Sequence, residues 1–144
     1  MKTENLKVKG RFEMRTFKDG VLIDTYIDNN LVVAAGRNAV AELLGNTSPN
    51  KFITEIKFGE EGTPPSSLDT GVLNPFTKAV TAVSYPAIGE VKFDWTLELA
   101  ENNGVTIKEY GLFCSDGTMF ARKTGTDVVK TNLIRLEGSW TILF

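Results

Sequence analysis

The sequence predicts a mainly β fold, an antiparallel β-sandwich of about seven or eight strands with one short α-helix at about residues 33–44. Residues 90–100 alternate between apolar and polar side chains, which is typical of a strand with one buried and one solvated face. Two Asp-Gly pairs, beginning at Asp19 and Asp116, separate strand-like segments and favour tight hairpin turns. Only residues 32–44 carry a helical period.

The first predicted element is a hairpin over residues 6–27. The segments LKVKGRFEMRTF and VLIDTYI flank the turn Lys18-Asp19-Gly20, which favours a two-stranded hairpin. The polar run Asp28-Asn29-Asn30 is expected to end the second strand.

The helix is expected next, in the segment VVAAGRNAVAELL. Gly36, Val40, Leu43 and Leu44 fall on one helical face, and Gly45-Asn46 is a plausible C-terminal stop. A helix this short is marginal alone, so we expect it to lie against the sheet.

The middle of the chain contains two predicted strands on either side of a long loop. FITEIKFG, residues 52–59, and FTKAVTAVSYP, residues 76–86, are the strands. Residues 59–75 are rich in Gly, Pro and Ser and are predicted to be irregular. A loop of this length in a compact domain is often functional or interfacial.

The C-terminal part predicts a second hairpin and a closing strand. VTIKEYGLFC and TMFARKT flank Ser115-Asp116-Gly117. The last strand, IRLEGSWTILF, places five large apolar residues on one face, so the C-terminus, including Phe144, is expected to belong to the buried sheet. The length suits a single domain over residues 1–144.

Composition narrows the function classes. The net charge is −2 with a pI near 5.2, which argues against a nucleic-acid partner. The single cysteine, Cys114, excludes an intrachain disulfide and fits a reducing compartment. Histidine is absent, which removes the commonest general base and metal ligand. An enzyme would have to use carboxylates or lysine instead, and the sequence marks no such site. We expect no enzyme activity, no catalytic residue, no cofactor and no metal.

Targeting signals are not apparent in the sequence. The N-terminal segment lacks the apolar core of a secretory signal, and no apolar run approaches the roughly 20 residues of a membrane helix. We expect a soluble protein that is made in the cytoplasm and has no membrane partner.

Two sets of side chains are candidates for a site. The hairpin around Asp116 brings Glu109 close to Arg122 on one face, and we expect a charge-assisted pair, for which a bidentate geometry is available. A structural role in fixing register is favoured over a role at a subunit contact. The long loop is the second candidate, and with the N-terminal hairpin it is expected to contact neighbouring subunits. Its interface residues are predicted to be Glu60, Thr63, Pro64, Pro65, Ser67 and Asp69.

The order of several C-terminal elements resembles a family of small structural proteins from the virions of tailed bacteriophages, associated with the tail, tail fibre or baseplate. An acidic residue and Gly-Leu-Phe precede an Asp-Gly turn, an Ala-Arg strand follows, and a Trp-Thr-Ile-x-Phe ending closes the sheet. Here these are Glu109, Gly111-Leu112-Phe113, Asp116-Gly117, Ala121-Arg122 and Trp140-Thr141-Ile142 with Phe144. The helix segment, and the loop with Ser67-Leu68-Asp69-Thr70, extend the resemblance over about residues 30–144.

The resemblance implies a non-enzymatic particle component located in the virion tail and synthesised in the host bacterial cytoplasm. It implies action as a homo-oligomer, a trimer or a hexameric ring, in contact with other virion proteins.

Three alternatives stay open. One is a receptor- or glycan-binding module of a fibre, which would need exposed aromatic side chains beside polar groups. Another is a head decoration or neck (collar) protein, which would differ in its partners. The third is an enzyme such as a carboxylate-based glycosidase, which would need two carboxylates about 5–10 Å apart in a cleft.

Overall fold

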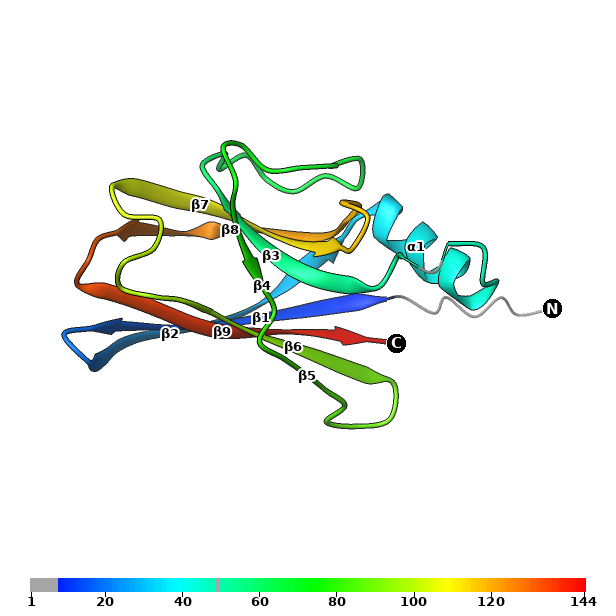
Figure 1. The fold of residues 1–144 in the computed structure, drawn as a ribbon, viewed down its shortest axis with the longest axis horizontal. Helices are drawn as coiled ribbons and strands as arrows, with labels where there is room; N and C mark the ends of the chain where they lie inside the picture. Colours follow the sequence, from blue (N-terminus) through cyan, green and yellow to red (C-terminus); the bar gives the residue numbers. More distant parts are fainter. Residues whose placement is uncertain (1–7, 49) are drawn as a thin grey trace.

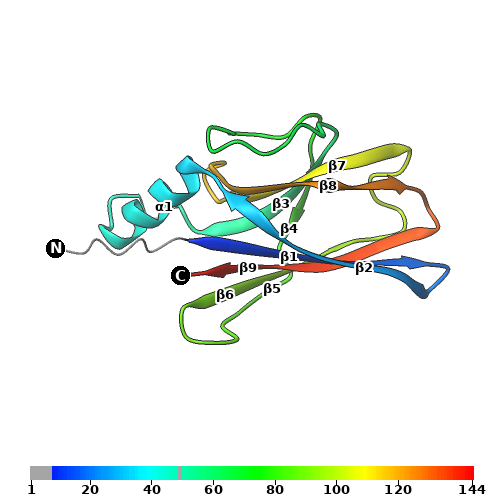
Figure 2. The same cartoon turned by 180° about the vertical axis from the view of Figure 1, so that it is seen from behind.

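The computed structural model describes residues 8–48 and 50–144. Nine strands form one antiparallel sheet in the order β4-β3-β7-β8-β2-β1-β9-β6-β5, which curls into a half-barrel with its two halves facing one another (Figure 1). The strands are β1 (Lys9–Lys18), β2 (Val21–Val32), β3 (Ile53–Gly59), β4 (Phe76–Ala79), β5 (Ala82–Ser84), β6 (Glu90–Leu97), β7 (Val105–Cys114), β8 (Met119–Lys130) and β9 (Ile134–Leu143). One helix, α1 (Ala34–Leu44), lies near the end of the half-barrel where the C-terminus emerges (Figures 1 and 2).

The mainly β prediction is confirmed, but the described strands number nine rather than seven or eight, and a sandwich is not confirmed. The difference lies in residues 76–86, which form two strands rather than one. β4 pairs with β3 at one edge of the sheet, and β5 pairs with β6 at the other. Between them the Val80 N–H donates to the Thr54 carbonyl at 3.0 Å and the Thr81 N–H to the Asp94 carbonyl at 2.8 Å. Apolar alternation predicts a strand but does not reveal that it changes neighbours.

The N-terminal hairpin extends beyond its predicted end at residue 27, because β2 continues to Val32. The polar residues expected to end the strand have partners within the fold. The side-chain oxygen of Asn30 accepts a hydrogen bond from the Trp140 indole N–H at 2.7 Å, and Lys123 binds the Asp28 carboxylate at 2.6 Å. Residues 6 and 7 of the predicted hairpin lie outside the described residues.

The core lies inside the curl and is dominated by aromatic rings. Phe12 packs against Trp95, Tyr110 and Trp140 with ring centroids 4.9–5.8 Å apart, and Phe58 contacts Trp95 at 5.4 Å. These distances are typical of favourable aromatic pairs. The predicted alternation is confirmed over β6, since Phe93, Trp95 and Leu97 all point into this core, but the strand ends at Leu97 rather than at residue 100, and Leu99 is exposed.

The helix begins one residue after its predicted start, and its predicted face is buried only in part, at Gly36 and beside Val40, which packs against the core. Gly36 and Ala39 are buried, whereas Leu44 is 85% exposed. A Cβ at Gly36 would lie 2.2 Å from the Phe120 carbonyl oxygen, so the helix approaches β8 through its smallest residues. No helix in the described part of the chain is long and apolar enough to cross a membrane.

The last strand is in the sheet as predicted, but Phe144 itself is 61% exposed rather than buried. Within β9, Gly138 lies opposite Met14 on β1 and Trp95 on β6. A Cβ at Gly138 would lie 2.3 Å from the Glu13 carbonyl oxygen and 2.5 Å from the Trp95 ring. This position therefore tolerates only glycine.

Replacing Gly138 with alanine should destabilise the protein by about 1–3 kcal/mol, because the added methyl group overpacks the core against backbone. The free energy of unfolding, measured by urea denaturation, checks this. Gly71→Ala is the matched control, since its Cβ would have no neighbour within 4 Å. Equal stabilities of the two variants would contradict the prediction.

Candidate functional site

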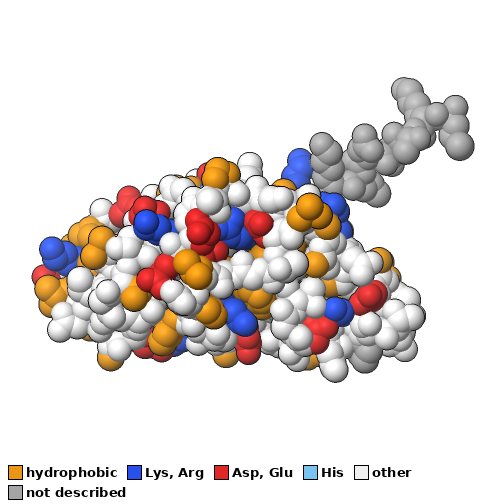
Figure 3. Space-filling model, turned by 90° about the horizontal axis from the view of Figure 1, so that it is seen from above, with side chains coloured by type: hydrophobic (Ala, Val, Ile, Leu, Met, Phe, Trp, Pro, Cys, Tyr) orange, Lys and Arg blue, Asp and Glu red, His pale blue; other side chains and the backbone are white. Residues whose placement is uncertain are grey.

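The long loop lies across the outer face of the sheet, over β7 and β8 (Figure 1). It leaves β3 after Gly59 and enters β4 at Phe76. Figure 3 views the molecule from this side and shows acidic, basic and apolar side chains interspersed, without a patch of a single charge sign. The loop is therefore a mixed surface resting on two central strands.

Glu109 and Arg122 support this loop from below. In the β7–β8 pairing Gly111 is opposite Arg122 and Glu109 is opposite Thr124, so Glu109 and Arg122 are diagonal neighbours on the same face. The Arg122 Nε donates to the Glu109 Oε1 at 3.0 Å, and the two side chains are only 3% and 1% exposed. The contact uses one nitrogen and one oxygen, so the bidentate geometry that the sequence allowed is not formed.

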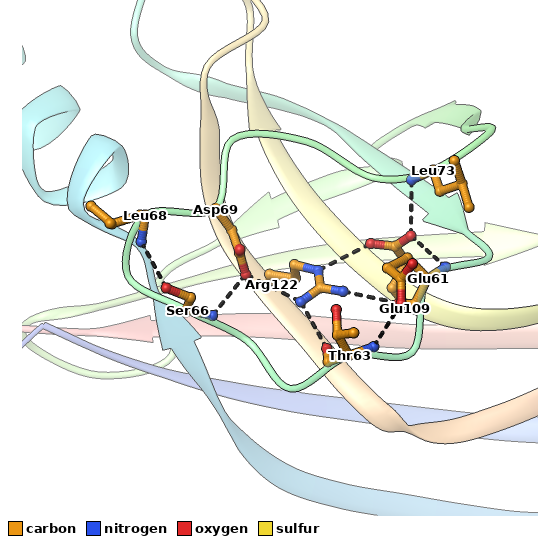
Figure 4. Close-up of polar contacts among 8 residues, drawn as sticks. All are labelled: Glu61, Thr63, Ser66, Leu68, Asp69, Leu73, Glu109 and Arg122. Carbon is orange, nitrogen blue, oxygen red and sulfur yellow. Dashed lines mark hydrogen bonds and ion pairs between the residues drawn. The ribbon is translucent and has the colours of Figure 1, made fainter.

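The rest of the Arg122 guanidinium binds the loop (Figure 4). Its Nη1 donates to the Thr63 carbonyl at 3.0 Å and to the Asp69 carboxylate at 3.1 Å. Its Nη2 donates to the Glu61 carbonyl at 2.9 Å. Hydrogen bonds from a charged group contribute more than neutral ones, so Arg122 holds three points of the loop.

Glu109 binds the same loop through its other oxygen. The Oε2 accepts the backbone N–H of Glu61 at 2.7 Å and that of Leu73 at 2.9 Å, near the two ends of the loop (Figure 4). The Glu60 N–H donates to the Leu73 carbonyl at 3.1 Å and closes the loop base. We call this arrangement of Arg122, Glu109 and their loop partners the clamp.

Two glycines make room for the clamp. Gly59, on β3, is opposite Glu109, and a Cβ there would lie 2.6 Å from the Glu109 Oε2. Gly111, opposite Arg122 and two residues from Glu109, would place its Cβ 2.5 Å from the Phe113 ring and 3.2 Å from Val72 of the loop. Side chains at either position would separate the loop from the buried pair.

The predicted interface residues divide into two groups. Asp69 and the Thr63 carbonyl face inward toward Arg122, and the Ser67 carbonyl accepts the Ala34 N–H at 2.8 Å at the start of α1. The side chains of Thr63, Pro64 and Ser67 face solvent, and those of Glu60, Pro65 and Asp69 are half-buried. The loop is thus partly a structural clasp and partly an accessible surface.

Sequence reasoning missed the most exposed apolar residue of the loop. Leu68 is 80% exposed at the tip, and Leu73 is also exposed. It also missed the backbone N–H groups that bind Glu109, because backbone donors leave no trace in the amino-acid pattern. A leucine between Ser67 and Asp69 in a polar loop was the available signal for an exposed contact.

The clamp does not offer a reactive group. Both Glu109 oxygens accept hydrogen bonds from fixed donors, so the carboxylate is not open to act as a base. Burial raises the pKa of the Cys114 thiol to about 11, which keeps this fully buried group protonated near neutral pH. Among the described residues no cluster of three metal-binding side chains occurs.

A second candidate is an apolar pocket of about 380 Å³ at the end of the half-barrel next to α1. Its wall includes Phe120, Phe93 and Ile142 from the sheet, and Phe52, Tyr85 and Phe144 at its rim are exposed. The charged residue of the lining is Lys51, whose ammonium binds Asp116 at 2.7 Å. Size and lining are those of a small-molecule site.

Comparisons with known proteins do not extend this description. The chain matches no protein-family model, and no curated protein and no solved structure matches it.

Replacing Glu109 with glutamine should destabilise the fold by about 3 kcal/mol, because it leaves the buried Arg122 without its nearest counter-charge and puts an amide where two N–H donors converge. Urea denaturation gives the stability, and hydrogen exchange at Glu61 and Leu73 should quicken.

The control is Glu98→Gln, which removes a carboxylate from an ion pair of similar length, 2.9 Å to Arg135, that is largely exposed. This change should cost less than about 1 kcal/mol. If Glu109→Gln lowers the free energy of unfolding by no more than Glu98→Gln does, the clamp does not stabilise the loop.

Proposed function

We propose that this protein is a non-enzymatic structural component of a tailed bacteriophage virion, in the tail, the baseplate or a fibre attachment, and that it acts by oligomeric assembly. Its partners are copies of itself, in a trimer or hexameric ring, and other virion proteins. The observation that carries the proposal is the clamp, in which the buried Glu109–Arg122 pair fixes the conformation of a surface loop.

A fixed loop suits assembly on physical grounds. Binding through a mobile loop loses affinity because the loop must be ordered, whereas a loop already held by Arg122 and Glu109 avoids most of that entropy loss. The clamp also keeps Leu68 exposed at the tip, where a neighbour could bury it. The resemblance in residue order over about residues 30–144 supports the same class of protein.

The closed hydrogen bonding of the clamp favours a structural role over a catalytic one. A catalytic carboxylate needs an oxygen that can reach a substrate, and the Glu109 oxygens are directed to Arg122 and to two loop N–H groups. On this proposal the chain has no turnover, and its activity is the formation of contacts.

Native mass spectrometry of the purified protein should show a discrete oligomer, and Leu68→Ser should weaken it. A point substitution is preferable to removing residues 60–70, because the deletion would also strip Arg122 of its partners. Leu99→Ser, at another exposed leucine, is the control and should leave the mass unchanged. An oligomer unaffected by Leu68→Ser would exclude the loop tip from the contact.

The virion assignment has its own readout. Particles purified on a density gradient from a culture that expresses this protein should contain it at a fixed copy number, measured by quantitative mass spectrometry. A copy number of three, six or twelve fits the tail or baseplate, and hundreds of copies would indicate head decoration instead. Loss of the protein from purified particles would overturn the assignment.

The apolar pocket favours a second function, a receptor- or glycan-binding module of a fibre. It supplies the exposed aromatic side chains that such a site requires, Phe52, Tyr85 and Phe144, beside the polar Lys51. On this alternative a glycan array should show specific binding that is lost in Tyr85→Ala. Ile88→Ala, an exposed residue outside the pocket lining, should retain binding. An array without specific binding would remove this alternative.

A further inference from the structure

β2 has an open edge for most of its length. On one side it pairs with β1 from Val21 to Asn30, whereas on the other it pairs with β8 only at Leu31 and Val32. Before that point the β1–β2 hairpin extends away from β8 toward the end of the molecule opposite α1 (Figure 2). Within the described residues no strand therefore covers this side of β2 between Val21 and Asn30.

Lys123 shows which backbone groups face the open side. Its Nζ, coming from β8, donates to the Asn29 carbonyl at 3.2 Å, so the peptide groups of Asn29 point away from β1. Successive residues of a strand direct their N–H and C=O groups to alternate sides. Thr25 and Ile27 therefore present their donors and acceptors to the open side, and Lys123 marks where the open edge ends.

The side chains on this strand differ from those on its neighbours. Ile23 and Ile27 are 55% and 59% exposed, and Val21 and Leu22 are exposed beside them. On the adjoining β1 and β9, the outward side chains form ion pairs, such as that of Arg15 with Glu137 at 3.0 Å. Natural edge strands are commonly protected by charged residues, above all lysine, and by proline; residues 21–30 contain no lysine or proline, and their charged residues are Asp24 and Asp28.

We infer that a second copy of this chain pairs antiparallel with β2 along this edge, about a two-fold axis at Thr25. The inference rests on the proposed assembly function and names one of its contacts. In an antiparallel pair, residues directly opposite each other point to the same face of the sheet. Two identical strands therefore keep equivalent faces together only when the two-fold axis passes through a residue. Near the middle of the open edge, the axis can lie at Asp24, Thr25 or Tyr26.

Charge selects among these registers. An axis at Asp24 places two Asp24 carboxylates opposite each other, and an axis at Tyr26 places Asp24 opposite Asp28 of the second copy. Like charges directly opposite in a sheet are destabilising. An axis at Thr25 instead places Ile23 opposite Ile27, twice by symmetry, which is a favourable β-branched pair.

The same register brings Asp24 near a lysine of the second copy, Lys123, which also binds Asp28 of its own chain at 2.6 Å. Asp24 makes no ion pair among the described residues, and in this register it lies opposite Tyr26 of the second copy. Lys123 of that copy lies over the Tyr26 ring, with its Nζ 5.4 Å from the centroid. The β1–β2 pairing is irregular between Thr16 and Phe17, and Ile23 has no opposite residue on β1. We expect this irregularity to limit the segment that pairs with the second copy to about Ile23–Ile27.

The experiment is analytical ultracentrifugation of the purified full-length chain over a range of concentrations, with Ile27→Lys as the test variant. Ile27→Lys should raise the dissociation constant of the dimeric contact about tenfold or more, because it removes both Ile23–Ile27 pairs and adds like charges at the interface. Leu44→Lys, the same change at an exposed residue beyond the edge strand, should leave association unchanged. Circular dichroism shows whether both variants keep the fold.

A cross-link tests the register itself. Thr25→Cys lies on the proposed axis, so a short bis-maleimide should link two copies efficiently, whereas Leu44→Cys should not link. The native Cys114 is buried and does not interfere.

Association that is insensitive to Ile27→Lys, absence of the Thr25 cross-link, or a wild-type chain that stays monomeric would each overturn the β2 contact. The virion assignment would still be judged separately, by the presence of the protein in purified particles. If the protein is present in particles but does not pair through β2, only the β2 contact is wrong. If it dimerises through β2 but is absent from particles, only the virion assignment is wrong.

Discussion

The two edges of the sheet are joined by a connection of only two residues, and this constraint shapes the whole molecule. Val80 and Thr81 link β4 to β5, the first and last strands in the sheet order. A flat nine-stranded sheet would separate its edges by eight strand spacings, roughly 38 Å, so the sheet must curl until they meet. The aromatic core fills the inside of that curl. Apart from these two edges, the described sheet is unpaired where β2 and β8 diverge, and the β2 side of that opening runs from Val21 to Asn30.

The outer face of the curl poses a different problem, because the central strands β7 and β8 carry charged residues that are buried. The fold solves it with the clamp: Glu109 and Arg122 neutralise each other, and the loop supplies the remaining partners from its backbone. A buried ion pair is rarely a large net source of stability, but removing one partner is strongly destabilising. The pair therefore acts chiefly as a specificity device, since departure of the loop would remove the partners of the Glu109 Oε2 and of both Arg122 Nη atoms.

Local patterns in the sequence predicted local structure well and long-range structure less well. The alternation in residues 90–97, the Asp-Gly turns and the helix near residues 34–44 all depend on neighbours in the chain, and these elements formed where expected. The proximity of Glu109 and Arg122 followed from counting outward from the Asp116 turn. The extension of β2 through Asp28 and Asn30 was not predictable in this way, because it depends on Lys123 and Trp140, which are distant in sequence. Nor could periodicity reveal that Phe144 is exposed, since a strand pattern continues past the point where the core ends.

The clamp and the open edge have opposite physical characters, and the proposed assembly uses both. The loop is a surface ordered in advance, so a partner can bind it with little loss of entropy. The β2 edge offers directional backbone hydrogen bonds, which specify orientation and register more strictly than apolar contact alone. An open apolar edge is a hazard for a chain that functions alone, because it invites unspecific pairing. In a symmetric assembly the same edge is covered by an identical strand, and the Asp24 and Asp28 carboxylates exclude the neighbouring registers. The clasped loop and the register-selective edge are therefore the two features on which the proposed assembly function depends, one by its fixed conformation and the other by its directional hydrogen bonds.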